Sequence, residues 1–205
     1  MVNVAVEGES DRGVATAVVR AAGKSVGIVR VAGGKSRLDP LIPKYNRAAV
    51  QHPWVVFRDS DSVCPVMLRQ QLSVPIAAWN AAFCLRIAHS MSEAWLLSDP
   101  DAFARYFKVP RGRVPSDPEA LPHAKRTLLA LCSDSRSRSI RSEVVSRAGE
   151  PGPLFVAHMN DFATDAWNAQ KAAERSASLR RAIAAIRSLP ESGRDGEAAS
   201  TVLLH

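Results

Sequence analysis

The sequence predicts an α/β fold in which a mainly parallel sheet is flanked by helices. Short apolar segments alternate with amphipathic segments over residues 2–88, and several of the apolar segments end at glycine or at acidic residues. This alternation of strands and helices is typical of a parallel sheet covered by helices. The second half of the chain has helical or irregular patterns, which predict an added C-terminal helical portion.

The first elements follow from local patterns. Residues 2–6 are short and apolar and predict a buried strand that ends at Glu7 and Gly8. We expect Ser10 to cap the helix that follows, because a serine side chain can accept a hydrogen bond from the first helical turn. The apolar stripe of that helix runs over residues 14–22, and Gly23 is expected to end it.

The strands and helices after Gly23 are predicted from the same kinds of apolar pattern. Further strands are predicted at residues 26–31, 54–57 and 82–88, with helices at 39–51 and 65–72. Beyond them, helices are predicted from Ser92 to about Lys108, at 125–131 and over 161–189, with a polar, basic run at 133–142. The predicted organisation is a core at residues 1–110, a helical portion packed on it at 111–189, and a loose tail at 190–205.

Composition limits the function classes. The formal net charge of +7 favours polyanionic partners such as nucleic acid. A protein without such a partner can have the same charge if its whole proteome is rich in arginine. The three cysteines form no CxxC pair, so we expect reduced thiols. The sequence shows no signal peptide and no membrane-spanning apolar run, which predicts a cytoplasmic protein.

Acidic residues follow two of the predicted strands. Glu7 ends the first strand, and Asp59 and Asp61 follow the third. Because working groups of parallel sheets lie just past the carboxyl ends of the strands, we expect these acids at one edge. Clustered carboxylates repel one another, and Mg²⁺ or Mn²⁺ would relieve that repulsion. Asp11, at a helix start, is a further candidate ligand, and Glu93, which opens the helix after the fourth strand, a further acid of the cleft.

These acids also have a purely structural interpretation. Aspartates are common in turns, and Asp11 and Glu93 at helix starts would stabilise helix dipoles without any ligand. From the residues alone, the metal site and this structural interpretation both remain open.

The two acidic signatures resemble those of the Toprim domain. "VAVEGESD" (residues 4–11) is similar to the glutamate motif that ends strand one of that Rossmann-like fold, and "DSD" (residues 59–61) is similar to its paired aspartates. The first stretch also looks like the motif of the nucleases of the overcoming-lysogenization-defect class, with Asp11 in place of a second glutamate.

A second resemblance covers most of the chain. The chain is similar to the small Toprim-like proteins known as domain of unknown function 4276. The similarity rests on six motifs that occur in the order typical of that family: "VEGESDRG", "GGKSRL", "VVFRDSD", "RIAHSMSEAWLLSD", "PHAKRTL" and "AWNAQKAAERSASLRR". The resemblance implies a Toprim-like metal-binding core at residues 1–110. It also implies a separate ATPase partner in trans, and a role in phage defence or genome maintenance.

The resemblance assigns roles to the acids. Glu7 would act as a general acid or base or as a metal ligand, and Asp59 and Asp61 would hold Mg²⁺. Glu93 would be an acid near the cleft. Ser60 stands where such pairs often have glycine, and it is small enough for the turn.

Three basic residues are candidate substrate contacts. Lys35, in "AGGKS", follows a strand at its carboxyl end and can contact a phosphate or be a surface lysine. The stretch is not a Walker A loop, because that motif begins with a glycine where this chain has Val29. Arg58 can form a salt bridge or contact substrate, and Lys125 is a candidate phosphate contact. The Ser/Arg run at residues 133–142 can bind a nucleic-acid backbone or form a solvated loop.

Two functions are therefore expected from the sequence. The first is a Mg²⁺-dependent enzyme that acts on phosphodiester bonds in nucleic acid. The second is a non-catalytic module of the same fold that docks nucleic acid or protein.

Overall fold

The computed structural model describes residues 1–61, 63–88 and 92–191. Most of the predicted tail at 190–205 lies outside the described residues. In the part of the chain that is described, no helix is both long and apolar enough to span a membrane.

The sheet has four parallel strands in the order β2-β1-β3-β4. The predicted α/β class with a parallel sheet is confirmed. The strands are β1 (Val2–Val6), β2 (Val26–Val31), β3 (Trp54–Asp59) and β4 (Phe83–Ala88). β3 runs two residues further than predicted, because Arg58 and Asp59 still pair with Ile87 and Ala88 of β4.

β1 and β3 are neighbours, with Val4 opposite Val55. The ends of these two strands are therefore adjacent, although they lie far apart in the sequence. This strand order brings Glu7, just after β1, next to Asp59 at the end of β3.

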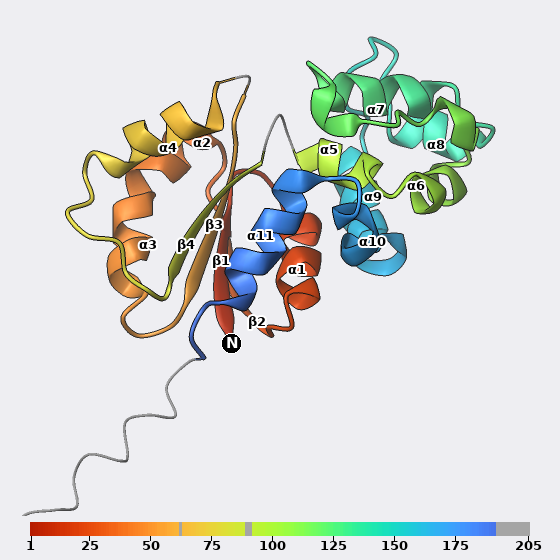
Figure 1. Cartoon of the computed structure of the whole chain (residues 1–205). Helices are drawn as coiled ribbons and strands as arrows, with labels where there is room; N and C mark the ends of the chain where they lie inside the picture. The colour runs from red at the N-terminus through yellow and green to blue at the C-terminus, as the bar shows by residue number, and fades with distance from the viewer. Residues whose placement is uncertain (62, 89–91, 192–205) are drawn as a thin grey trace, which may run out of the picture.

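Helices cover both faces of the sheet (Figure 1). One face packs against α1 (Asp11–Ala21) and α11 (Ala177–Arg187), and the core there includes Val4, Val55 and Leu179. The opposite face packs against α2 (Lys35–Leu38), the 3₁₀-helix η1 (Asp39–Leu41) and α3 (Ile42–Ala48), and α4 (Pro65–Ser73) lies beside β4. Successive side chains of each strand point to opposite faces of the sheet, as in any pleated strand.

A second group of helices lies beside α1 and past the carboxyl edge of the sheet (Figure 1). It consists of α5 (Ser92–Leu97), α6 (Pro100–Phe107), η2 (Arg111–Arg113), η3 (Pro118–Ala120), α7 (Ala124–Ser133), α8 (Arg138–Glu143), α9 (Phe155–Asp161), the π-helix η4 (Phe162–Ala166) and α10 (Ala169–Ala173).

Several predicted helices differ from the observed ones. The single helix predicted from Ser92 to Lys108 is wrong: it is divided into α5 and α6, because Pro100 supplies no N–H and Asp99 caps α6 through the N–H of Ala102 (3.3 Å). The polar run at 133–142 is not a loop throughout, since Ser137 caps α8. The helix predicted at 39–51 is shorter, and the one at 161–189 is divided into several.

The first helix starts differently from the prediction. Ser10 makes no side-chain capping bond; instead the Asp11 carboxylate accepts the N–H of Gly8 (2.9 Å) and closes the turn after β1. The predicted end is confirmed, because Gly23 has φ +78° and its N–H bonds the carbonyl of Arg20.

Candidate functional site

The backbone after β1 is held by a glycine pair after β2. The N–H groups of Gly33 and Gly34 both donate to the carbonyl of Glu7, at 3.0 and 2.9 Å. Both glycines have positive φ, +78° and +113°, which a residue with a side chain rarely adopts. The "AGGKS" loop therefore uses these two donors to position Glu7 instead of directing them at a phosphate.

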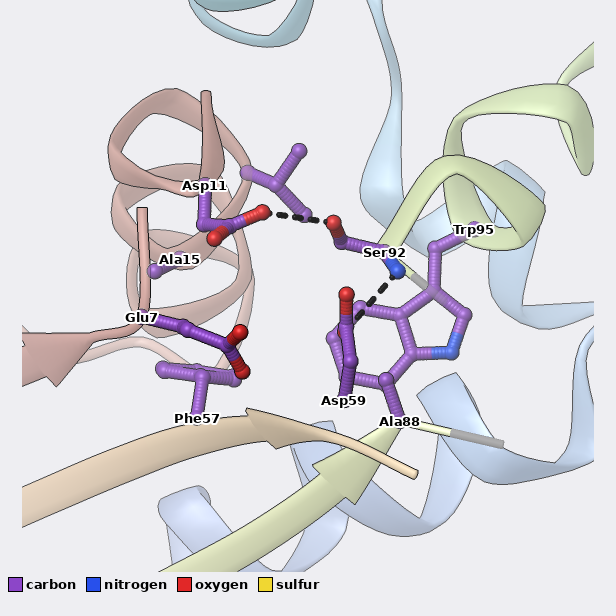
Figure 2. A pocket seen from close by; sticks show the side chains of 9 residues that line it. Glu7, Asp11, Ala15, Phe57, Asp59, Ala88, Ser92 and Trp95 are labelled. Carbon is purple, nitrogen blue, oxygen red and sulfur yellow. Dashed lines mark hydrogen bonds between the residues drawn. The ribbon is translucent and has the colours of Figure 1, made fainter. Parts of the chain in front are cut away.

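Three carboxylates line one small pocket at the carboxyl edge of the sheet. Figure 2 shows Glu7, Asp11 and Asp59 directed into it, between α1 and the start of α5. The free space inside is about 10 Å³, which is room for one water molecule or one small ion and too little for a sugar or a base. The other lining residues are Val14, Ala15, Phe57, Ala88, Ser92 and Trp95.

Ser92 joins two of these acids. Its hydroxyl donates to Asp11 Oδ1 (2.7 Å), and its backbone N–H donates to Asp59 Oδ1 (3.0 Å), as the dashed lines in Figure 2 show. Because Asp11 also accepts the N–H of Gly8, its carboxylate is fixed on both sides. Ser92 was not predicted as a site residue; its position at the first residue of the helix after β4 is the signal that could have indicated it.

Arg58 lies on the other side of the acids and is buried, with 5% of its side chain exposed. Its guanidinium donates to Asp39 Oδ1 (2.9 Å), to Glu7 Oε2 (3.3 Å) and to Asp61 Oδ2 (2.8 Å), and also to the carbonyl of Asp59. The sequence left open whether Arg58 forms a salt bridge or contacts substrate; in the structure it forms salt bridges. Asp39 was not predicted, and no sequence signal marked it.

Asp61 does not enter the pocket with Asp59. It adopts φ +48° in the turn after β3, and its carboxylate binds Arg58 and the Lys35 ammonium (3.0 Å). Lys35 opens α2 and is 56% exposed, so it lies at the predicted edge of the sheet, paired with an acid. The structure thus divides the predicted ligands into a pocket group of Glu7, Asp11 and Asp59, and Asp61 outside it.

The electrostatics of the two groups differ. Burial, together with the negative charges of Asp11, Glu93, Glu7 and Asp61, raises the pKa of Asp59 well above its usual value. Burial also raises the pKa of Glu7, against the lowering effect of Arg58. Burial opposes ionisation of Asp61 as well, but hydrogen bonds from Arg58 and Lys35 outweigh it and lower the pKa of that group. Arg58 and Lys35 therefore offset the charge of Asp61, whereas burial and neighbouring negative charges dominate at Asp59.

Glu93 and Lys125 form a second, adjacent pair. Glu93 lies on α5 with 6% of its side chain exposed, and Lys125 of α7 is 3.8 Å from its Oε1. The Lys125 ammonium also lies 5.0 Å from the centre of the Phe155 ring. Glu93 Oε2 is buried without a hydrogen-bond partner, and burial raises the pKa of the group despite Lys125. Neither residue lines the pocket, but Glu93 is close enough to Asp59 to act on its charge.

The pocket is large enough for one small ion, and its carboxylates could hold such an ion only through few protein ligands. Among the described residues, no three acidic, histidine or cysteine side chains are arranged to hold one ion. Mg²⁺, however, commonly binds one or two carboxylates and completes its shell with water and substrate phosphate. Asp11 and Asp59, which Ser92 holds beside this ion-sized space, could serve as carboxylate ligands of that kind.

Comparisons with protein-family models, with curated proteins and with solved structures found no match to this chain. The resemblance to Toprim-like proteins therefore stays a prediction from the motifs.

Proposed function

We propose that this chain is a Mg²⁺-dependent enzyme that acts on phosphodiester bonds in nucleic acid. The observation that carries the proposal is the arrangement of Glu7, Asp11 and Asp59 around one ion-sized space at the carboxyl edge of a parallel sheet. Because that space admits no sugar or base, the substrate would approach from the rim with only a phosphate oxygen or a water directed inward.

The residues take distinct roles in this proposal. Asp11 and Asp59 would hold the ion, which supplies charge neutralisation at the phosphate and lowers the pKa of an attacking water. Glu7 would accept a proton from that water, since its raised pKa brings it nearer the range of a useful base. Lys35 is exposed enough to leave Asp61 and meet a phosphate of the substrate.

Metal titration by calorimetry tests the ion site directly. We expect wild-type protein to bind Mn²⁺ and Mg²⁺, and Asp59→Asn to bind at least about tenfold more weakly because it removes one charged ligand. Asp134→Asn, which changes an exposed acid paired with Arg113, is the matched control and should bind like wild type. Equal affinity in wild type and Asp59→Asn would refute the metal site.

Cleavage of labelled single-stranded DNA, double-stranded DNA and RNA with Mn²⁺ tests the chemistry. We expect Glu7→Gln to lower the cleavage rate by roughly 10²- to 10⁴-fold, the usual contribution of a positioned base, while metal affinity changes less. A wild-type protein that binds the ion but cleaves none of these substrates would contradict the proposed reaction.

One observation favours the alternative, a non-catalytic docking module. The Arg58 guanidinium already supplies a positive charge to Glu7, Asp39 and Asp61, so these acids are stabilised without an ion. In a docking module the acidic edge would be structural. That function predicts tight binding of nucleic acid or protein with neither metal affinity nor turnover, so the two experiments above separate it from the enzyme.

A further inference from the structure

A basic groove runs along the free edge of the sheet. β4 is an edge strand, and the groove lies beside it between α4 and α11, which Figure 1 shows on either side of β4. Its open volume is about 340 Å³. Three arginines line it, Arg69, Arg86 and Arg181, together with the apolar side chains of Val66, Leu85 and Ile87, and no carboxylate of the described residues does.

These guanidinium groups lack acidic partners. In the ranges that the structure describes, neither Arg69, Arg86 nor Arg181 forms an ion pair. Arg69 donates to the carbonyl of Leu85 (3.2 Å) and lies over the Trp79 ring, while Arg86 Nε is buried with no hydrogen-bond partner. The groove therefore presents guanidinium charge that no carboxylate of the described residues neutralises, and an anionic ligand would supply the missing negative charge.

The groove lies next to the acidic pocket. Ile87 lines the groove and the following residue, Ala88, lines the pocket. The Trp95 indole N–H, from the pocket wall, donates to the hydroxyl of Ser178 in the groove wall (2.7 Å). The groove and the acidic pocket therefore share a wall formed by the end of β4, Trp95 and Ser178.

We infer that this groove binds the backbone phosphates of single-stranded nucleic acid. Guanidinium forks match phosphate oxygens, and the apolar walls suit sugars and unpaired bases, which a duplex would not present. A peptide added as a further strand fits less well, because Arg69 already occupies the Leu85 carbonyl at the strand edge. The choice of ligand rests on the proposed function. It makes single-stranded nucleic acid the substrate class of the pocket formed by Glu7, Asp11 and Asp59.

The test is the affinity of a fluorescein-labelled oligothymidylate, measured by anisotropy in EDTA so that no metal or cleavage is involved. Arg181→Glu should weaken binding by about tenfold or more, since it removes a charge-assisted phosphate contact. It should also reduce the slope of log affinity against log salt by about 0.7, the value for one contact to a single strand. Arg187→Glu, the same charge change on an exposed face of the same helix, is the matched control and should leave both nearly unchanged.

Further variants and probes complete the test. Arg86→Gln should also weaken binding; if it fails to fold by circular dichroism, the exposed Arg181 variant still decides the matter. Equal losses for Arg181→Glu and Arg187→Glu would overturn the inference, as would Arg181-dependent binding of a labelled polyglutamate peptide without binding of the oligonucleotide. In the wild-type protein, metal binding and cleavage without Arg181-dependent oligonucleotide binding would overturn the groove alone. Arg181-dependent binding in EDTA with neither metal affinity nor cleavage would overturn the proposed function alone.

Discussion

Adjacent residues at the end of β3 have opposite electrostatic roles. Side chains alternate between the faces of a strand, so Asp59 enters the pocket while Arg58 projects from the other face. Asp61, beyond the strand, turns back to Arg58 and does not join Asp59. A D-x-D motif therefore does not by itself bring its two carboxylates to one ion; the residue at which the strand ends decides this.

Asp59→Asn should make the metal-free protein more stable. The substitution keeps the shape and an acceptor for the Ser92 N–H but removes a charge that burial and four neighbouring acids disfavour. We expect the free energy of unfolding in EDTA to rise by about 1 to 2 kcal/mol, as it does when poorly compensated buried charges are removed. Urea unfolding at pH 7.5, followed by circular dichroism, measures it.

The control and the opposing outcome are simple. Asp134→Asn changes an exposed acid and should shift the unfolding midpoint much less. A clear loss of stability in Asp59→Asn would mean that the folded protein compensates the Asp59 charge, contrary to the raised pKa of that group.

At the scale of elements, the turn between β2 and α2 depends on a glycine. Gly34 has φ +113° and ψ 158°, a region essentially restricted to glycine, while its Cβ position is open space. Gly34→Ala should therefore destabilise the fold through backbone strain alone, by about 1 to 3 kcal/mol. Thermal unfolding measures the change, and Gly112→Ala, where a Cβ also meets nothing, is expected to be neutral. A neutral Gly34→Ala would show that the turn can adopt another conformation.

Glu119, in the 3₁₀-helix η3, binds the start of α11, which lies far from it in the sequence. Its carboxylate accepts the N–H groups of Ala177 and Ser178 (3.0 Å each) and the hydroxyl of Ser176 (2.7 Å). Burial alone would raise its pKa, but these hydrogen bonds, with that of the Ser178 hydroxyl, hold the pKa below the usual 4.5. A folded-state pKa below the unfolded one stabilises the fold above pH 4.5, and that stability is lost as pH falls through the folded value.

Glu119→Gln should therefore lower stability most at neutral pH. We expect a loss of about 1 kcal/mol at pH 7, as for a lost charged helix cap, and convergence of the two proteins as the pH falls through the folded-state pKa of Glu119. Urea unfolding at a series of pH values checks this. A gap between wild type and variant that is the same at every pH would exclude the carboxylate charge as its cause.

The sequence located strands better than helices. A buried strand is marked by a short apolar run with a turn at its end, and this signal placed β1 and β2 correctly. Helix ends depend on single caps: the break at Asp99 and Pro100 was missed because the apolar stripe continues across it. The Glu119 contact to α11 could not be predicted, since nothing local links a turn to a helix start nearly 60 residues later.

At the scale of the whole molecule, one hydrophobic core joins the sheet to the second half of the chain. It includes Val4 of β1, Phe103 of α6, Leu128 of α7 and Ile183 of α11. Residues on both sides of the predicted boundary at residue 110 therefore contribute to this one core. A shared core favours unfolding in one cooperative step.

We expect urea unfolding to give one transition, with the same midpoint by tryptophan fluorescence and by far-ultraviolet circular dichroism. Phe103→Ala removes a fully buried ring that contacts Phe107 and Phe162, and it should lower the free energy of unfolding by about 3 to 5 kcal/mol. The midpoints of the two signals should fall together. Separate midpoints for the two signals would show that the helical portion unfolds independently.

The sequence by itself determined the α/β class, the parallel strands and the acids that follow them, because apolar period and strand ends are local properties of a chain. Only the tertiary structure decided which acids share a pocket. Strand order brought Glu7 beside Asp59, the fold carried Asp11 and Ser92 across to them, and the length of β3 turned Asp61 to Arg58. These outcomes depend on contacts between residues far apart in the chain, which no local pattern encodes.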